Sequence, residues 1–151
     1  LDSIDGLETG GILLGHDESG QAEVTVAGRP GPGAERTPNR FRRDLAYAQQ
    51  LSDDAFEADG SVWLGEWHTH PGGPEMPSEL DLRSYAEMLT DTELGFRQFL
   101  CIIVTMRRVP RSTPLLWPWI VLPNGLVHTS AIHLISSYNT PRWSKKGPCG
   151  E

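Results

Sequence analysis

The chain has 151 residues, with 13 basic side chains against 20 acidic ones and a formal net charge of −7. This length predicts one domain with its own core, and it excludes a (β/α)₈ barrel, which needs about 250 residues. The acidic balance, without any cluster of Lys and Arg, argues against nucleic acid as a partner, and every apolar run is much shorter than the roughly 20 residues of a membrane-spanning helix.

The first third of the chain predicts two paired strands followed by an exposed loop. The segment from Gly10 to His16 is apolar and bounded by glycines, and Ala22 to Ala27 alternates with a period near two. The polar turn between them has the chemistry of a hairpin. Residues 29–39 contain three prolines and two glycines, which oppose both a helix and a central strand.

The segment from Arg43 to Gly60 predicts an amphipathic helix. Gly60 stands where a helix of this length is expected to stop. The apolar residues of the segment recur at helical spacing and fall on one face: Leu45, Ala48, Leu51, Ala55 and Phe56.

Ser61 to Thr69 is rich in aromatic and β-branched residues and predicts a strand that runs into the Pro- and Gly-rich turn at residues 71–74. A second helix is expected to begin at Pro77 or Ser78, because the Ser78 hydroxyl can cap it and Asp81 lies in its first turn. Its apolar stripe consists of Leu80, Tyr85, Met88 and Leu89.

Three further strands are predicted at residues 97–105, 115–122 and 126–135, with Pro123-Asn124-Gly125 as the turn between the last two. Residues 1–135 therefore form the expected domain, and residues 136–151 form a polar tail that only a partner would order. Strands interleaved with two helices predict an α/β sandwich whose central sheet is mixed.

We expect both cysteines to carry unpaired thiols. Cys101 lies in an apolar run and Cys149 in the polar tail, a usage that suits a reducing cytosol. The N-terminus shows no basic-then-apolar leader, so we expect a cytoplasmic location. Because Leu1 already lies in sequence that reads as ordered, we also expect that the start belongs to a longer parent.

The candidate metal-binding residues lie at the end of the strand at 61–69 and in the segment that follows it. On a strand, His68 and His70 point to the same face, so their imidazoles converge. Asp81 lies in the first turn of the next helix, where a tight turn can fold it back over the same point. Two His and one Asp provide the three protein ligands of a catalytic zinc ion and leave the fourth position to water.

Two further side chains fit amide hydrolysis. Glu8 precedes Gly10-Gly11 at the entry of the first strand, where its carboxylate can take the proton of the water and pass it to the leaving amine. Ser78 lies one helical turn before Asp81, so its hydroxyl is expected to face the same cavity and to donate to an oxyanion.

These residues resemble the JAMM signature of the JAB/MPN metallopeptidases, a Glu followed by His-x-His-Pro-x₆-Ser-x₂-Asp, in which Glu8, His68-Thr69-His70-Pro71, Ser78 and Asp81 match with the spacing intact. The resemblance covers about residues 7–135. It implies the JAB/MPN fold, a cytidine-deaminase-like α/β/α sandwich with a mixed central sheet. It also implies one Zn²⁺ held by His68, His70 and Asp81, with Glu8 and Ser78 as catalytic residues.

Three stretches resemble the bacterial branch found beside E1-like and E2-like genes in CBASS and related anti-phage operons. They are residues 8–15, 41–44 and 65–71. This resemblance implies an isopeptidase that removes a ubiquitin-like protein from a conjugate made by such machinery. Two features depart from the family: the strand and helix that usually precede the Glu are largely missing, and residues 28–39 are unusually rich in Pro and Gly.

Other interpretations stay open beside this one. Glu66 shares the face of His68, so it either orients that imidazole as an acceptor or is a solvated edge residue. Ser78 can be an N-cap as well, and Asp81 can simply favour the helix dipole. A non-enzymatic relative would serve as a scaffold that binds a ubiquitin-like or E1/E2-like partner.

Two other metal folds are disfavoured. A cupin would use His68, His70 and Glu75 with His128, but a helix after Ser78 does not belong in its barrel. A zinc deaminase needs a Cys-x-x-Cys motif, and the sequence contains none.

Overall fold

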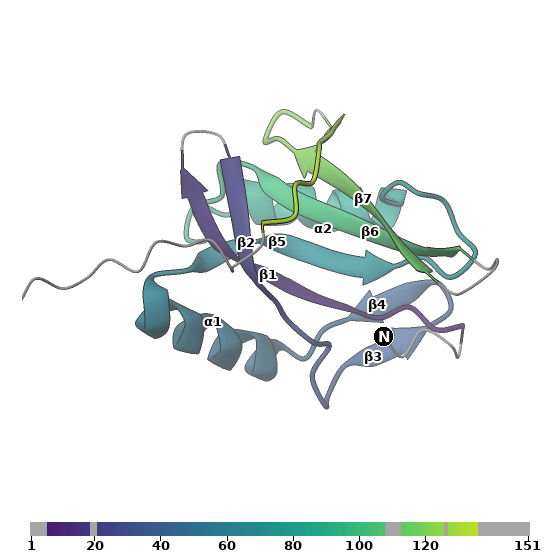
Figure 1. The fold of residues 1–151 in the computed structure, drawn as a ribbon, viewed down its shortest axis with the longest axis horizontal. Coiled ribbons are helices and arrows are strands. Elements are labelled where there is room, and N and C mark those ends of the chain that lie inside the picture. The colour runs from purple at the N-terminus through teal and green to yellow at the C-terminus, as the bar shows by residue number, and fades with distance from the viewer. Residues whose placement is uncertain (1–5, 19–20, 108–112, 126, 136–151) are drawn as a thin grey trace, which may run out of the picture.

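The computed structural model of the protein describes residues 6–18, 21–107, 113–125 and 127–135. Its centre is a curled sheet with the strand order β2-β1-β5-β6-β7-β8 (Figure 1). The strands of this sheet are β1 (Gly10–Glu18), β2 (Gln21–Ala27), β5 (Val62–Thr69), β6 (Phe99–Arg107), β7 (Thr113–Val121) and β8 (Val127–Thr129). β5 and β6 are parallel and the other neighbours are antiparallel, which confirms the predicted α/β class with a mixed central sheet.

The helix α1 (Leu45–Asp59) ends at Gly60 as predicted, but it begins two residues after Arg43, where the prediction placed its start. The Asp44 side chain caps it by accepting a hydrogen bond from the Tyr47 N–H. Gly60 ends it in the left-handed conformation at φ 79°, with its N–H donating to the Phe56 carbonyl. The helix lies against β1 and β5, but its apolar stripe is only partly covered, because Leu45 and Phe56 at the two ends remain largely exposed.

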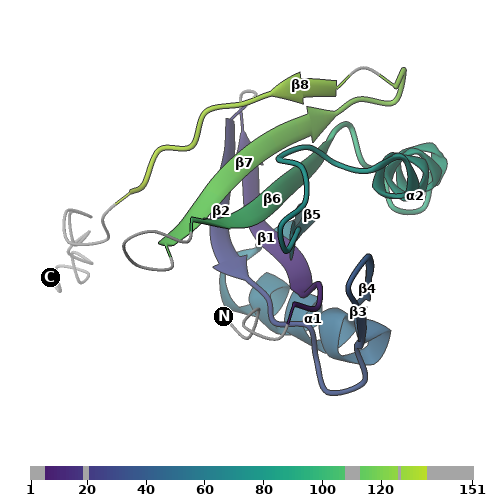
Figure 2. The ribbon, with the colours of Figure 1, turned by 90° about the vertical axis from the view of Figure 1, so that its right-hand side faces the viewer.

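The helix α2 (Glu79–Thr90) forms the crossover between the parallel strands β5 and β6. Its capping box is complete: the Ser78 hydroxyl accepts from the Asp81 N–H, and the Asp81 carboxylate accepts from the Ser78 N–H. Figure 2 shows α2 beside the β6–β7 part of the sheet. The sequence therefore places Asp81 at the start of α2 by the same interactions that start the helix.

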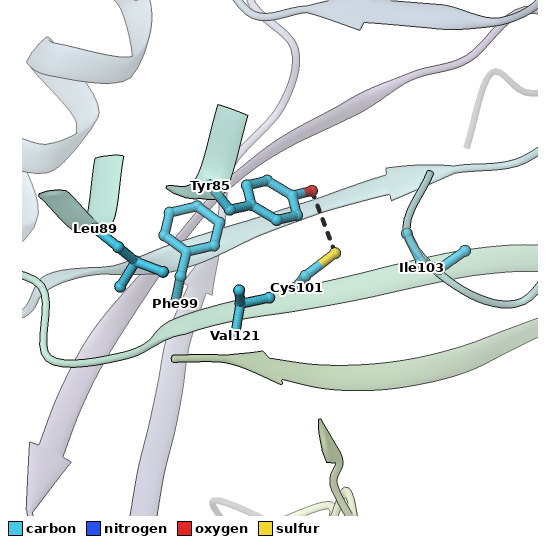
Figure 3. Close-up of a cluster of buried hydrophobic side chains, with 6 residues drawn as sticks. All are labelled: Tyr85, Leu89, Phe99, Cys101, Ile103 and Val121. Atoms are coloured by element: carbon cyan, nitrogen blue, oxygen red, sulfur yellow. Dashed lines mark hydrogen bonds between the residues drawn. The ribbon is translucent and has the colours of Figure 1, made fainter. Parts of the chain in front are cut away.

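The main hydrophobic core lies between α2 and the strands β6 and β7 (Figure 3). The Tyr85 ring stacks on Phe99 with the ring centroids 4.6 Å apart, and its hydroxyl lies 3.3 Å from the Cys101 sulfur. Burial raises the pKa of the Cys101 thiol well above its usual range, so this thiol is an inert core group. The buried members of the cluster are Tyr85, Leu89, Phe99, Cys101, Ile103 and Val121.

The prediction of an exposed loop over residues 29–39 is wrong for its second half. Residues Glu35–Thr37 (β3) and Arg40–Arg42 (β4) form a short antiparallel hairpin of their own. Pro38 does not oppose this hairpin because it lies in the turn, where its missing N–H breaks no ladder bond. The Thr37 carbonyl accepts from the Glu8 N–H at 2.9 Å, so the hairpin is attached to the entry of β1.

The last predicted strand, residues 126–135, is shorter in the structure. β8 ends at Thr129, and Leu134 beyond it is 93% exposed, so no neighbouring layer covers that side chain. The predicted tail, residues 136–151 with Cys149, lies outside the described residues. Within the part of the chain that is described, none of the helices has the length and apolar character that crossing a membrane requires.

Candidate metal centre

The two histidines converge at the C-terminal end of β5. His68 is 2% exposed, His70 is 6% exposed, and their Nε2 atoms lie 3.0 Å apart. Backbone pairing fixes this end of the strand, because the Thr69 N–H donates to the Thr9 carbonyl and the Thr69 hydroxyl accepts from the Thr9 N–H. The period of two along β5 thus brings both imidazoles to one point, as the spacing predicts.

The Asp81 carboxylate reaches the same point from α2. Its Oδ2 atom lies 3.4 Å from His68 Nε2 and 3.7 Å from His70 Nε2. The same oxygen accepts hydrogen bonds from the Ser78 N–H at 2.7 Å and from the Ser78 hydroxyl at 2.6 Å. The cap of α2 therefore orients the carboxylate toward the histidines.

The donor set fits a tetrahedral zinc ion. Bonds of about 2.0–2.1 Å to such an ion separate two ligand atoms by about 3.3 Å, close to the three distances among His68, His70 and Asp81. Two imidazole nitrogens and one carboxylate oxygen are also the ligand types that leave zinc an open fourth position. Within the described residues, these three form a group that could hold a metal ion.

Hydrogen bonding on the far side of His70 prepares it as a ligand. Its Nδ1 lies 2.8 Å from the Pro74 carbonyl, an acceptor that requires the proton on Nδ1 and leaves Nε2 free to coordinate. The loop that carries this carbonyl is held by the Trp119 indole N–H, which donates to the Glu75 carbonyl at 3.0 Å. The Glu75 side chain is exposed, as expected.

The charges of the three residues depend on one another. Burial alone would raise the pKa of the Asp81 carboxyl, but its contacts with His68 and His70 hold that pKa well below the usual range. Burial alone would lower the pKa of His70, but the contact with Asp81 and the Pro74 carbonyl raises it instead. Asp81 is therefore a permanent carboxylate, ready to bind a cation.

Glu8 lies at the rim of this group. Its backbone is held by the β3–β4 hairpin, because its N–H donates to Thr37 and its carbonyl accepts from Arg36 Nε at 3.0 Å. Its half-buried carboxyl interacts electrostatically with His68 and with the other two members of the group. Burial raises the pKa of Glu8, and the charges of the histidines only partly oppose this rise.

The Ser78 side chain is exposed, and its hydroxyl is hydrogen-bonded to Asp81. Because it donates to Asp81 Oδ2 and accepts from the Asp81 N–H, its hydrogen-bonding capacity is largely used inside the capping box. The structure thus places Ser78 beside the metal ligand, and its N-cap role is confirmed.

One residue near the candidate metal centre, Arg43, was not predicted from the sequence. Arg43 forms an ion pair with Glu66, and Glu66 Oε1 lies 4.0 Å from His68 Nδ1. Sequence spacing cannot reveal this pair, since Arg43 precedes α1 and Glu66 lies in β5. The available signal was the stretch Phe41-Arg42-Arg43-Asp44, which resembles the bacterial branch of the family.

Similar proteins with curated names share one description, CD-NTase/cGAS isopeptidase. The relative from Escherichia coli (strain TW11681) is 33% identical over 88 residues, which cover 57% of this chain and 56% of that protein. The relative from Enterobacter hormaechei subsp. hoffmannii (strain UCI 50) is 36% identical over 90 residues, which cover 57% and 48%. The matched region therefore spans about half the length of the curated relatives.

Solved structures match a larger part of the chain. A protein from Desulfitobacterium hafniense aligns with a TM-score of 0.61 at 22% identity, covering 85% of this chain and 78% of its own, and shows the fold alone. A protein from Salinibacter ruber aligns with a TM-score of 0.55 at 26% identity, covering 93% and 84%. Residues 4–117 match the prokaryotic homologs of the JAB domain, a span of well over half the sequence. The protein is therefore a member of the prokaryotic JAB-domain family.

Proposed function

We propose that the protein is a zinc-dependent isopeptidase that cleaves the bond between the C-terminus of a ubiquitin-like protein and its target or C-terminal extension. The observation that carries this proposal is the convergence of His68, His70 and Asp81 at one point, with the half-buried Glu8 carboxyl beside them. The isopeptidase names of the curated relatives support the reaction class.

In this proposal, His68, His70 and Asp81 hold one Zn²⁺ ion. Zinc bound by such ligands acts as a Lewis acid and lowers the pKa of water to about 7. Glu8 accepts the proton of the attacking water at its carboxylate and delivers it to the nitrogen of the leaving amine. The raised pKa of Glu8 suits both halves of this transfer, because a carboxyl with a higher pKa holds the proton better between the two steps.

Ser78 takes a supporting role. Its hydroxyl steadies the oxyanion that develops on the scissile carbonyl, which requires it to turn from Asp81 Oδ2 toward the substrate. Its N–H continues to donate to Asp81 during that turn, so the ligand stays oriented. Glu66 supports His68 from the opposite side of the ring.

The names of the relatives, together with the resemblance of three stretches to proteins of E1- and E2-containing operons, support a proposal for the substrate class. We propose a conjugate in which a ubiquitin-like protein is joined to a nucleotidyltransferase of the CD-NTase type by E1/E2-like machinery. We propose that the reaction takes place in the cytoplasm, whose reducing conditions suit an unpaired thiol such as that of Cys101.

The decisive test compares the parent with Glu8→Gln. The substrates are a ubiquitin-like protein linked to a CD-NTase lysine and the same protein carrying a C-terminal peptide, and release of the free C-terminus is followed by mass spectrometry. The zinc-loaded parent is expected to cleave, and a chelator is expected to stop it. Glu8→Gln is expected to lose at least 10²-fold in rate while keeping its zinc, because only proton transfer is removed.

Two results would contradict parts of this mechanism. Unchanged cleavage by Glu8→Gln would remove Glu8 from proton transfer. A zinc-loaded parent that binds the conjugate without cutting it would favour the alternative function, a scaffold for a ubiquitin-like or E1/E2-like partner.

A further inference from the structure

The Arg43 side chain is largely buried and contacts residues of β5 and α2. It stacks over the Trp63 ring at 5.0 Å from the centroid, and one of its nitrogens lies 4.0 Å from the Met88 sulfur on α2. Its Nη1 donates to Glu66 Oε2, and the two side chains are only 14% and 12% exposed. Arg43 therefore joins the segment before α1 to β5 and to α2.

The second oxygen of Glu66 faces the candidate metal centre. Glu66 Oε1 lies 4.0 Å from His68 Nδ1, whose ring presents Nε2 to His70 and Asp81 on its other side. This distance is longer than a hydrogen bond, so Glu66 faces His68 Nδ1 without bonding to it in this structure. A ligand histidine almost always donates its second N–H to such an acceptor.

Burial makes the pairing with Arg43 necessary. A carboxylate with 12% exposure loses most of its hydration, so Glu66 needs the Arg43 guanidinium as a partner. The stack on Trp63 and the fork geometry of the guanidinium hold Arg43 in one position. The neighbouring pair Arg42–Glu35 differs in this respect, because its side chains are 57% and 68% exposed.

We propose that Arg43 is a positioning residue of the candidate metal centre: by pairing with Glu66 it holds that carboxylate facing His68 Nδ1, which favours the His68 tautomer that coordinates through Nε2. This inference rests on the proposed function only in taking His68 as a metal ligand. Arg43 touches neither the metal nor the substrate and acts through Glu66.

The test uses Co²⁺ as a spectroscopic stand-in for zinc and measures its affinity by visible absorption titration. Arg43→Met keeps the long apolar stem and removes the charge, and it is expected to weaken Co²⁺ binding about tenfold or more, in the range found for residues that support a ligand. Arg43→Lys keeps the charge but loses the fork geometry and the stack, so it is expected to recover part of this loss. Arg42→Met breaks the exposed pair next to it and is expected to leave the affinity within about twofold of the parent.

A second variant separates positioning from packing. In the Glu66→Gln background, which is expected to bind Co²⁺ about tenfold more weakly than the parent, adding Arg43→Met is expected to change the affinity less than about twofold. This comparison also replaces the single variant if Arg43→Met does not fold, because the double variant leaves no unpaired charge. Unfolding midpoints in excess chelator report any general loss of stability.

Three outcomes would overturn the proposal. They are parent-like Co²⁺ affinity and spectrum in folded Arg43→Met, equal weakening by Arg43→Met with and without Glu66, and no recovery by Arg43→Lys. A parent that binds neither Co²⁺ nor Zn²⁺ would instead contradict the proposed function, so the two failures are distinguishable.

Discussion

At the scale of single residues, two of the three candidate ligands are oriented by hydrogen-bond partners behind their donor atoms. The Pro74 carbonyl directs His70, and the Ser78 N–H and hydroxyl direct Asp81. The conformational cost of assembling the ligands is therefore met during folding rather than on metal binding. Removal of one donor is expected to affect metal binding far more than it affects the fold.

His70→Ala tests this expectation. The zinc content of the purified variant is expected to fall from near one ion per chain to near zero, because two ligands cannot close a tetrahedral site. Elemental analysis gives the content, and circular dichroism shows whether the sheet is kept. His128→Ala is the matched control, since His128 is exposed on β8 and is expected to keep full zinc content. Stoichiometric zinc in His70→Ala would exclude His70 from the ligand set.

The ligand positions were predictable because each depends on local geometry. The period of two of a strand brings His68 and His70 together, and the capping signals at Ser78 fix where Asp81 lies. The Arg43–Glu66 pair was not predictable, because it depends on how the segment before α1 packs against β5 and α2. Local periodicity carries no information on such a tertiary contact.

At the scale of elements, the residue that caps α1, Asp44, also binds the loop before β3. The Asp44 carboxylate accepts from the Gly33 N–H at 2.9 Å and from the Tyr47 N–H at 3.1 Å, so it caps the helix and also holds the loop before β3. These backbone hydrogen bonds, that of Gly33 first, lower the pKa of Asp44. A lowered pKa in the folded state means that the ionised form stabilises the fold.

Because the pKa of Asp44 is lowered in the folded state, the effect of the Asp44→Ala substitution on stability is expected to depend on pH. The stabilisation by Asp44 is present above the unfolded pKa of about 3.9 and is lost as the pH falls through the lower folded value. The unfolding midpoint of Asp44→Ala is therefore expected to lie below that of the parent at pH 7, and the gap is expected to narrow as the pH falls from about 3.9 through the lower folded pKa. Asp44→Asn, which caps without titrating, is expected to stay above Asp44→Ala at both pH values. A difference independent of pH would contradict the role of the charge.

Helices and strands were predictable where a segment shows a single clear periodicity or composition. α1 shows apolar residues at helical spacing and the stop at Gly60, and β5 shows a run of β-branched and aromatic residues. The β3–β4 hairpin was hidden because Pro38 and the glycines before it oppose strands in general. It forms because Pro38 occupies a turn and because the Thr37 carbonyl bonds to Glu8. Residues far away in the sequence therefore decided the conformation of this segment.

At the scale of the whole molecule, one core sets the distance between the elements that supply the ligands. His68 comes from β5 and His70 directly follows it, Asp81 comes from α2, and Phe99 on β6 packs against residues of both elements. The Phe99 ring is fully buried and meets Tyr85 of α2 as well as Trp63 of β5. The docking of α2 on the sheet is therefore what brings the carboxylate to the imidazoles.

Phe99→Ala is expected to weaken both the fold and the metal centre. The loss of a fully buried ring and the cavity that it leaves cost about 3–5 kcal/mol in the free energy of unfolding. Because α2 then packs less firmly, Zn²⁺ affinity is expected to fall although no ligand is changed. Urea unfolding measures the stability, and competition with a zinc chelator measures the affinity. The control is Val24→Ala on the exposed face of β2. It is expected to change the free energy of unfolding by less than about 1 kcal/mol and to leave the Zn²⁺ affinity unchanged. Full Zn²⁺ affinity in a folded but destabilised Phe99→Ala would show that Asp81 is positioned by its own capping box without help from the core.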